Sequence, residues 1–535
     1  MQDNRTKNVT RNISFGLINK IVTLLLPFVT RTLMLYLVGV TSVGISTLFS
    51  SILSFLSLAE LGFGSAVVYS MYKPIADNDV PTIKALLNYY KKLYRVIGTA
   101  ILLIGSALAP FLPYLIKGET PVGINIYILY FIYLLNSVIS YFFAGYRQSL
   151  LSAYQRIDVK DKISILVTMV VRFAEIGVIV LTKNLYFYAA VAILGTLITN
   201  IGTAIATRRM FPEISCEGMI GVEERHAIRK KLGGLFGTKL NAIVVHQADT
   251  IVISSFLGLT ILAQYGNYYY ILSTVSSFVM ILFTSMTASI GNKIATDSQE
   301  RVYTLFRKIS FFNTWIVGWC AVCMLCLYQP FVQLWVGKDL MLPLSTALFM
   351  TLYFYIYQIQ RTILTFKDAG GLWYEDRFRP YVSMTINLIV NIVLVQYIGL
   401  NGVILSTIFA FFISVPWCNH VVFTKMFTEE PIENIKRMIL SLIITAGVAA
   451  ITYFLCNYMP DGIIGLILRA VICIVVPNLL FIAVYHRSAE YQEMKKMLYG
   501  MVFGRRKNGR KNKKRLQKTS FAEEKHGKDD RSELL

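Results

Sequence analysis

Long apolar runs, separated by short polar or basic segments, repeat along almost the whole chain. An α-helix needs about 20 apolar residues to cross the hydrocarbon core of a bilayer. Most of these runs approach or exceed that length, which favours helices over strands. The pattern therefore predicts about fourteen membrane-spanning helices, at approximately 13–38, 43–72, 94–116, 123–146, 163–182, 185–207, 236–257, 261–290, 309–336, 342–366, 380–398, 400–424, 436–458 and 462–485.

The first run, Ile13–Val38, differs from a purely lipid-facing helix because its polar residues gather on one side. At about 100° per residue, Lys20 and Arg31 return to nearly the same face of a helix. Thr23 and Thr30 lie in the same arc, whereas the opposite side is apolar. Charged side chains inside a membrane are costly and usually face a water-filled cavity. We therefore expect this helix to line such a cavity.

Composition and charge place the chain among polytopic membrane proteins. Hydrophobic residues make up 55% of its 535 residues and charged residues only 15%, whereas soluble proteins carry about 25% charged residues. The net charge of +22 does not indicate a nucleic-acid partner, because the basic residues alternate between connections. Of 52 Lys and Arg residues, 44 lie in the tail or on the side of the N-terminus, and three lie in the opposite connections. This asymmetry predicts that both termini are cytoplasmic.

An internal repeat divides the chain. Shifting the first two predicted helices by 219 residues places Gly39 on Gly258 and Lys20 on Lys239, and several apolar positions match in the same register. Parallel repeats of this kind are common in transporters, with the substrate between the halves. We predict an all-α integral membrane protein with two pseudo-symmetric six-helix lobes and two C-terminal helices. The expected parts are a first lobe at 1–210, a cytoplasmic linker at 211–235, a second lobe at 236–425, two additional helices at 426–486 and a basic, partly disordered tail at 487–535.

The sequence contains no motif of an enzyme. It has no GxxxxGK[ST] loop for a nucleotide phosphate and no HExxH motif for zinc. Cys320, Cys323 and Cys326 form a CxxCxxC run, but the run lies in an apolar span without a fourth cysteine placed to complete a cluster. We interpret these cysteines as packing residues, and we predict neither a catalytic site nor a resident metal or cofactor.

Cationic residues inside the spans are the first candidates for a functional role. Arg31, Lys20 and Lys239 are candidates for lining the expected cavity. For the two lysines an equally good interpretation is that they extend to the inner membrane surface. Arg172 is three residues before Glu175 on one helical face, and this spacing favours a structural ion pair.

Acidic and titratable residues inside the spans are candidates for coupling or gating. Asp249 is far from any other charge on its C-terminal side, so it lies within a span rather than in a loop. His246 lies on the same helical face, and Glu60 lies deep in the second predicted helix. An intramembrane carboxylate can bind a proton or a cation. A structural partnership between Asp249 and Arg31 is the alternative.

Several stretches resemble the Wzx-like polysaccharide flippases of the multidrug/oligosaccharidyl-lipid/polysaccharide exporter superfamily. They are LSFLSLAELGFGSAVVYSMYKPIADND at 53–79, YRQSLLSAYQR at 146–156, HQADTIVIS at 246–254 and DAGGLWYEDRFRPYVSMTINLIVNIVLVQYIGLNGVILST at 368–407. The resemblance extends over about residues 10–480. It implies a V-shaped pair of six-helix lobes with two extra helices. It also implies a lipid-linked oligosaccharide as cargo, flipped outward across a bacterial cytoplasmic membrane.

This resemblance gives the cationic residues a role. An undecaprenyl-pyrophosphate-type carrier bears phosphates that must cross about 30 Å of hydrocarbon, and an arginine can bind a phosphate through two hydrogen bonds. Arg31 is the first candidate for this contact, followed by Lys20 and Lys239. The implied partners are membrane lipids and the polymerase and glycosyltransferases of a capsule, lipopolysaccharide or exopolysaccharide pathway.

Two other functions fit the same pattern. One is a cation-coupled drug or metabolite antiporter of the same superfamily, which needs an ion-coupled carboxylate and a less cationic cavity. The other is a flippase for a lipid-linked peptidoglycan precursor. Coupling to a proton or a sodium ion stays open for each of them.

Overall fold

A computed structural model describes Asn19 and residues 22–57 and 63–496. Within this part the chain is almost entirely helical and contains no β-strand, which confirms the predicted all-α fold class. Nine of the described helices are long and apolar enough to cross a membrane alone, and a tenth span is bent. Every predicted span includes a helix within its described residues.

In chain order the helices are the first helix (Val22–Leu37), α2 (Val40–Leu56), α3 (Phe63–Ala76), α4 (Val80–Leu108), α5 (Ile126–Phe142), α6 (Gln148–Ala153), α7 (Ile157–Thr182), α8 (Leu185–Met210), α9 (Val222–Leu257), α10 (Leu259–Thr296), α11 (Gln299–Val336), α12 (Leu344–Ile359), α13 (Arg361–Ala369), α14 (Arg379–Ile398), α15 (Leu400–Met426), α16 (Pro431–Asn457) and α17 (Ile463–Tyr485). Short 3-10 helices follow α4, precede α6 and follow α11. The segment 211–235, expected as a linker, becomes part of α9 from Val222 onward.

Some predicted spans are divided. The run predicted as one helix at 123–146 ends with α5, and the chain bends by 52° before Gly145–Ala153. Ala144 adopts a left-handed conformation with φ 60°. A Cβ atom on Gly145 would lie 2.3 Å from the carbonyl oxygen of Ser140, so only glycine fits the turn. The predicted span runs four residues past the end of α5, because hydrophobicity alone does not record the turn at Ala144 and Gly145. The segment after the turn is more polar than α5 and contains Arg147 and Gln148.

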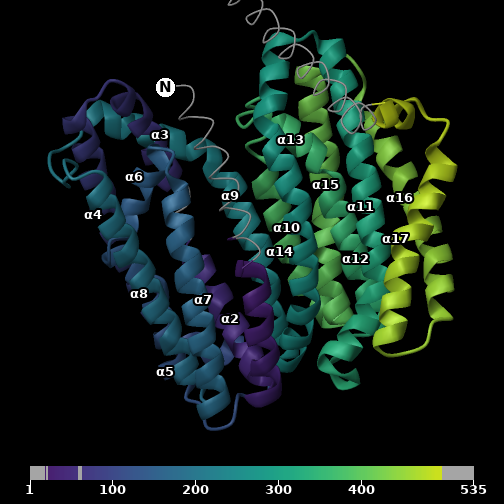
Figure 1. Ribbon diagram of the computed structural model, residues 1–535, viewed down its shortest axis with the longest axis horizontal. Helices are drawn as coiled ribbons and strands as arrows, with labels where there is room; N and C mark the ends of the chain where they lie inside the picture. Colours follow the sequence, from purple (N-terminus) through teal and green to yellow (C-terminus); the bar gives the residue numbers. More distant parts are fainter. Residues whose placement is uncertain (1–18, 20–21, 58–62, 497–535) are drawn as a thin grey trace, which may run out of the picture.

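The helices form two bundles that meet at one end. In Figure 1 the bundle of α2 to α8 leans against the bundle of α10 to α17 at the lower end, and the two separate towards the upper end. Helix α2 packs against both α9 and α10 at this joint, and α16 and α17 pack against α11 on the far side of the second bundle. The predicted two-lobed arrangement with two additional helices is therefore present.

The two glycines that the sequence repeat aligns, Gly39 and Gly258, have similar backbone conformations at the joint between the bundles. Gly39 connects the first helix to α2 with φ 109° and ψ 161°, and Gly258 connects α9 to α10 with φ 92° and ψ 173°. This backbone conformation is open to glycine and strained for other residues. A Cβ atom on Gly44 would lie only 2.3 Å from the carbonyl oxygen of Leu259, so α2 and α10 cross in close contact. The two connections thus share one geometry.

The first helix lies against the second bundle. The Phe28 ring stacks on Trp335 of α11 at 4.5 Å between centroids. The indole Nε1 of Trp335 donates to the hydroxyl of Thr32 at 2.7 Å, and the hydroxyl of Tyr36 donates to the carbonyl oxygen of Trp335 at 2.6 Å. The first helix therefore contacts residues about 300 positions further along the chain.

A buried ionic cluster closes one end of the second bundle. The guanidinium of Arg379 donates twice to the carboxylate of Asp376, at 2.6 Å in both hydrogen bonds. Lys367 donates to the same carboxylate at 3.0 Å, and Arg379 also donates to the hydroxyl of Ser414 at 2.7 Å. The three charged side chains are buried. The cluster holds α13, α14 and α15 together.

Asp376→Asn should lower the free energy of unfolding by about 3–5 kcal/mol, because it leaves two buried cations without their shared anion. Denaturant unfolding of the purified protein in detergent measures this loss. Asp368→Asn is the matched control, since Asp368 is half exposed and lies 3.4 Å from Lys367. Equal losses in the two variants would contradict the structural role of Asp376.

Candidate functional site

A polar cavity of about 450 Å³ lies beside the first helix. Helix α2 lines it with hydroxyl groups from one face, including Ser46, Ser50 and Ser54. Each of these hydroxyls donates to the carbonyl oxygen four residues earlier, which satisfies the donor and leaves the oxygen lone pairs available. The spacing of four residues is the sequence signal for this polar face.

Arg31 extends from the first helix to α10 across this cavity. Its Nε donates to Oδ1 of Asn267 at 2.8 Å, and one terminal nitrogen donates to the carbonyl oxygen of Ala263 at 3.3 Å. Gly266 makes this approach possible, because a Cβ atom there would lie 2.6 Å from a terminal nitrogen of Arg31. Both acceptors are neutral, so they orient the guanidinium without cancelling its charge.

The other charged residues that line the cavity cancel each other. Arg172 and Glu175 of α7 form an ion pair of 2.6 Å. Among the described residues that line the cavity, this leaves Arg31 as the cation without a carboxylate partner. The cavity therefore carries a net positive charge that an anion can neutralise.

An apolar cavity of about 670 Å³ adjoins the polar one. It is lined by the first helix, α10, α11 and α17, with side chains such as Leu24, Phe28 and Phe331. Tyr270 lines both cavities, and its hydroxyl donates to the carbonyl oxygen of Leu24. A polar and an apolar compartment therefore meet along the first helix.

Asp249 occupies a separate network in the second bundle. Nδ2 of Asn391 donates to one carboxylate oxygen at 2.6 Å, and the hydroxyl of Thr407 donates to the other at 3.3 Å. Asn387 in turn donates to the Thr407 hydroxyl at 3.0 Å. The carboxylate is buried, and the space between it and Tyr265 holds no water-sized volume.

Two amide side chains of this network have an unpaired oxygen atom. The Oδ1 atoms of Asn387 and Asn391 are buried and have no hydrogen-bond donor. The polar groups of this network are oxygens and amides, which suit a hard cation better than a soft one. Protonation of Asp249 is the other way to neutralise the buried charge.

The structure places the predicted residues in different surroundings. Arg31 and Asp249 belong to two separate networks and do not pair with each other. Lys20 and Glu60 lie outside the described residues. Lys239 and His246 lie in α9, and the structure does not describe their side chains.

Four polar residues of these networks were missed by the sequence analysis: Asn267, Asn387, Asn391 and Thr407. Asn387 and Asn391 lie four residues apart in an apolar span, which is a signal for a shared helical face. Nothing in the local sequence around Asn267 indicates that it contacts Arg31, because the two residues are 236 positions apart.

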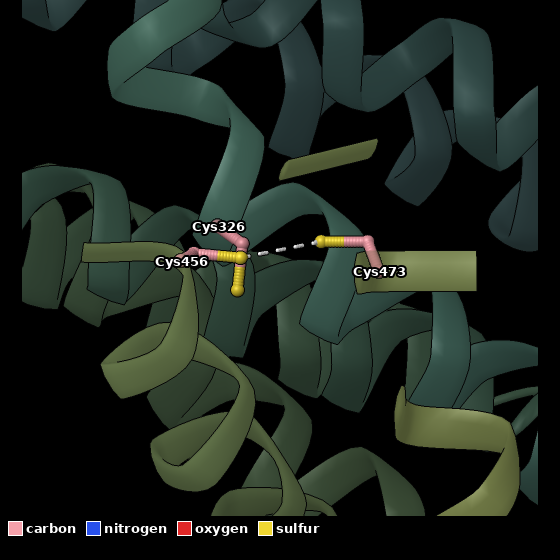
Figure 2. Close-up of side chains that lie close together, drawn as sticks. All are labelled: Cys326, Cys456 and Cys473. Atoms are coloured by element: carbon pink, nitrogen blue, oxygen red, sulfur yellow. Dashed lines mark hydrogen bonds between the residues drawn. The ribbon is translucent and has the colours of Figure 1, made fainter. Parts of the chain in front are cut away.

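Three buried cysteines meet between α11, α16 and α17. Figure 2 shows the sulfur atoms of Cys456 and Cys473 facing each other, with Cys326 beside Cys456, and all three sulfurs lie within 4.8 Å of each other. Of the CxxCxxC run, Cys326 alone belongs to this cluster, whereas Cys320 and Cys323 line the apolar cavity. Thiolates suit soft metals, but neighbours such as Val322, Val448 and Phe481 are apolar and favour neutral thiols. We keep the interpretation that these cysteines pack.

No protein-family model and no curated protein matches the sequence. Solved structures do match the fold. An inward-facing multidrug resistance MATE family transporter of the MOP superfamily aligns with a TM-score of 0.62 at 13% identity, over 78% of this chain and 99% of its own. The lipid II flippase MurJ in an inward closed conformation aligns with a TM-score of 0.57 at 16% identity, over 89% of this chain and 98% of its own.

A Vibrio cholerae MATE transporter, VcmN, aligns with a TM-score of 0.54 at 14% identity, over 78% of this chain and 98% of its own. At these identities the likeness shows the fold alone. The fold that the resemblance implied is therefore confirmed, whereas the Wzx-like family stays a prediction.

The positive charge of the polar cavity can be tested by thiol labelling. Ser50→Cys should react about tenfold faster with an anionic than with an equally sized cationic methanethiosulfonate. Each rate is first divided by the rate at which the same reagent reacts with free cysteine in solution. The background replaces Cys216, Cys320 and Cys323, the partly exposed native cysteines, by serine. Adding Arg31→Gln should abolish the preference. A preference that survives this change would show that Arg31 does not set the charge of the cavity.

Proposed function

We propose that this protein is a flippase that translocates a lipid-linked oligosaccharide of the undecaprenyl-pyrophosphate type across the bacterial cytoplasmic membrane. The cargo would serve surface polysaccharide synthesis. The polymerase and glycosyltransferases of that pathway and the membrane lipids are its proposed partners. Transport would proceed by alternating access of the two bundles around the cavity of Arg31.

The observation that carries this proposal is the contact between a cationic polar cavity and an apolar cavity along one helix. A lipid-linked oligosaccharide has the same division, with a charged and sugar-bearing head joined to a hydrocarbon chain. The head would occupy the cavity lined by serines and Arg31. The hydrocarbon chain would lie along the apolar side, which is lined by residues such as Phe28 and Phe331.

Arg31 suits a phosphate for two physical reasons. Its charge is uncompensated by the described residues that line the cavity, so a bound anion removes an energetic penalty. Its planar guanidinium can also form two parallel hydrogen bonds with phosphate oxygens. The neutral contacts from Asn267 and Ala263 hold the group in place without competing for that charge.

The Asp249 network is the proposed coupling site. Binding of a proton or a sodium ion there would neutralise a carboxylate buried between α9, α14 and α15. A charge change at a packed junction of helices can favour one arrangement of a bundle over another. No nucleotide-binding loop is present in the sequence, so an ion gradient is the proposed energy source.

The comparisons support a transport function in general rather than this cargo. The three solved structures named above are two MATE transporters and a lipid II flippase. The flippase aligns with a larger share of this chain than the MATE transporters do, 89% against 78%. A peptidoglycan-precursor flippase is therefore the second candidate. A cation-coupled drug antiporter is the third, since the apolar cavity also suits an apolar drug.

Arg31→Ala should abolish flipping while the protein still reaches the membrane, because the cavity loses its anion-binding charge. The measurement is translocation of a fluorescent pyrophosphate-linked oligosaccharide lipid in proteoliposomes. Gly266→Ala should also lower the rate, since the new methyl group displaces the guanidinium.

Lys338→Ala is the control for loss of a cation, because Lys338 lies in a connection outside both cavities. Flipping at the wild-type rate by Arg31→Ala would refute the proposed phosphate contact. If wild-type protein flips a peptidoglycan precursor or exports a drug instead, the second or third candidate is correct.

Asp249→Asn should uncouple transport from the ion gradient, because an amide neither releases a proton nor supplies an anionic ligand. We expect the rate in proteoliposomes to become insensitive to imposed proton and sodium gradients. Thr407→Val should weaken the dependence without abolishing it, since the carboxylate remains. Wild-type dependence on both gradients in Asp249→Asn would rule out a coupling role.

A further inference from the structure

A second cationic cavity lies at the end of the first bundle that we expect to face the cytoplasm, away from the cavity of Arg31. Its volume is about 440 Å³. We propose that it binds a phosphate group, presented by an anionic lipid headgroup of the inner leaflet or by a free phosphate. This inference does not depend on the proposed cargo or on the proposed energy source.

Three cations from three elements line this cavity. Lys91 comes from α4, Arg208 from the last turn of α8, and Arg147 from the short 3-10 helix before α6. The turn at Ala144 and Gly145, where the chain bends by 52°, carries Arg147 into this position. The site is therefore assembled by the fold and not by a run of adjacent basic residues.

The loop that follows α8 completes the cavity and is held firmly. Phe211 packs on Tyr154 with 4.3 Å between ring centroids. Nδ2 of Asn88 donates to the carbonyl oxygen of Gly218 at 2.9 Å, and Ile214 is buried. These contacts fix the loop on α4 and α6, so the cavity has a defined wall.

Arg147 is the unusual member of the set. Its side chain is only 7% exposed, and within the part of the chain that the structure describes it forms no ion pair. Its guanidinium lies 5.8 Å from the ring centroid of Tyr146 and interacts with the hydroxyl of that residue, a neutral partner that leaves the charge in place. Glu213 and Glu217 in the neighbouring loop are exposed and form no ion pair with it.

The other fully buried cations in the described chain are compensated, and Arg31 is only partly buried. Lys367 and Arg379 share Asp376. Arg469 donates to two carbonyl oxygens and lies 3.6 Å from an aspartate. A buried charge without a partner is strongly destabilising, so the exception at Arg147 indicates a ligand that supplies the missing negative charge.

The remaining polar groups of the cavity match a phosphate. The Ser215 hydroxyl oxygen is buried without a hydrogen-bond partner, so its proton is available to an acceptor. The arginines can each donate two parallel hydrogen bonds to phosphate oxygens, and Lys91 adds a point charge. Basic pockets between membrane helices on the cytoplasmic side are typical sites for anionic headgroups.

The test uses the full chain purified in detergent and compares short-chain phosphatidylglycerol with phosphatidylcholine of the same chain length by native mass spectrometry. We expect wild-type protein to prefer the anionic lipid. Arg147→Gln should lower its affinity for that lipid at least about tenfold, as removal of a charge-assisted contact does. The double variant Lys91→Gln/Arg208→Gln should have a similar effect, and it avoids any folding defect caused by the buried position.

Arg209→Gln is the matched control, because Arg209 is adjacent in sequence to Arg208 and exposed but does not line the cavity. It should bind like wild type. Competition by inorganic phosphate identifies the source of the ligand. If phosphate displaces the lipid, the site also binds free phosphate. If phosphate does not displace the lipid, the site is specific for a lipid headgroup. The proposal is wrong if wild-type protein shows no preference for the anionic lipid and does not bind phosphate, or if Arg209→Gln loses as much affinity as the cavity variants.

Discussion

An arginine inside a membrane-spanning bundle must be neutralised, hydrated or bound by a ligand. The surroundings of Arg31 meet this requirement with hydrogen-bond acceptors and a polar cavity. The first helix carries the guanidinium to the boundary of the two bundles, where α10 offers a glycine and two neutral oxygen acceptors. Serine hydroxyls of α2 line the adjoining polar cavity. The apolar cavity begins on the other side of the same helix. The polar and the apolar cavity therefore meet along the helix that carries this charge.

The two halves share a backbone and differ in their chemistry. The connections at Gly39 and Gly258 have nearly the same unusual conformation, as expected for a duplicated unit. The repeat places Thr30 and Arg31 of the first half on Asp249 and Thr250 of the second. One half thus holds a cation beside an open cavity, and the other holds a carboxylate in a closed network. Under the proposed function, one half would bind the cargo and the other would couple its transport to an ion gradient.

Much of the fold could be predicted from the sequence because hydrophobic length and the alternation of basic loops are local signals. The interruptions were harder to predict. The bend at Ala144 depends on the backbone conformation of Ala144 and Gly145, which hydrophobicity does not record. In the site, the polar face of the first helix indicated that Arg31 meets something polar, but a helical face does not identify its partner. Asn267 is 236 residues away, and only tertiary packing brings it to Arg31. The same limit applies to Asn391 and Asp249.

The most direct test of this account is equilibrium binding of two lipids that share the same sugars and hydrocarbon chain but differ in the linkage, which is a pyrophosphate in one and an uncharged ether in the other. If Arg31 binds the phosphate of the cargo, wild-type protein should bind the pyrophosphate lipid at least about tenfold more tightly. In Arg31→Gln the two lipids should bind equally. A wild-type protein that does not distinguish the lipids, or an Arg31→Gln variant that keeps the full preference, would contradict the account.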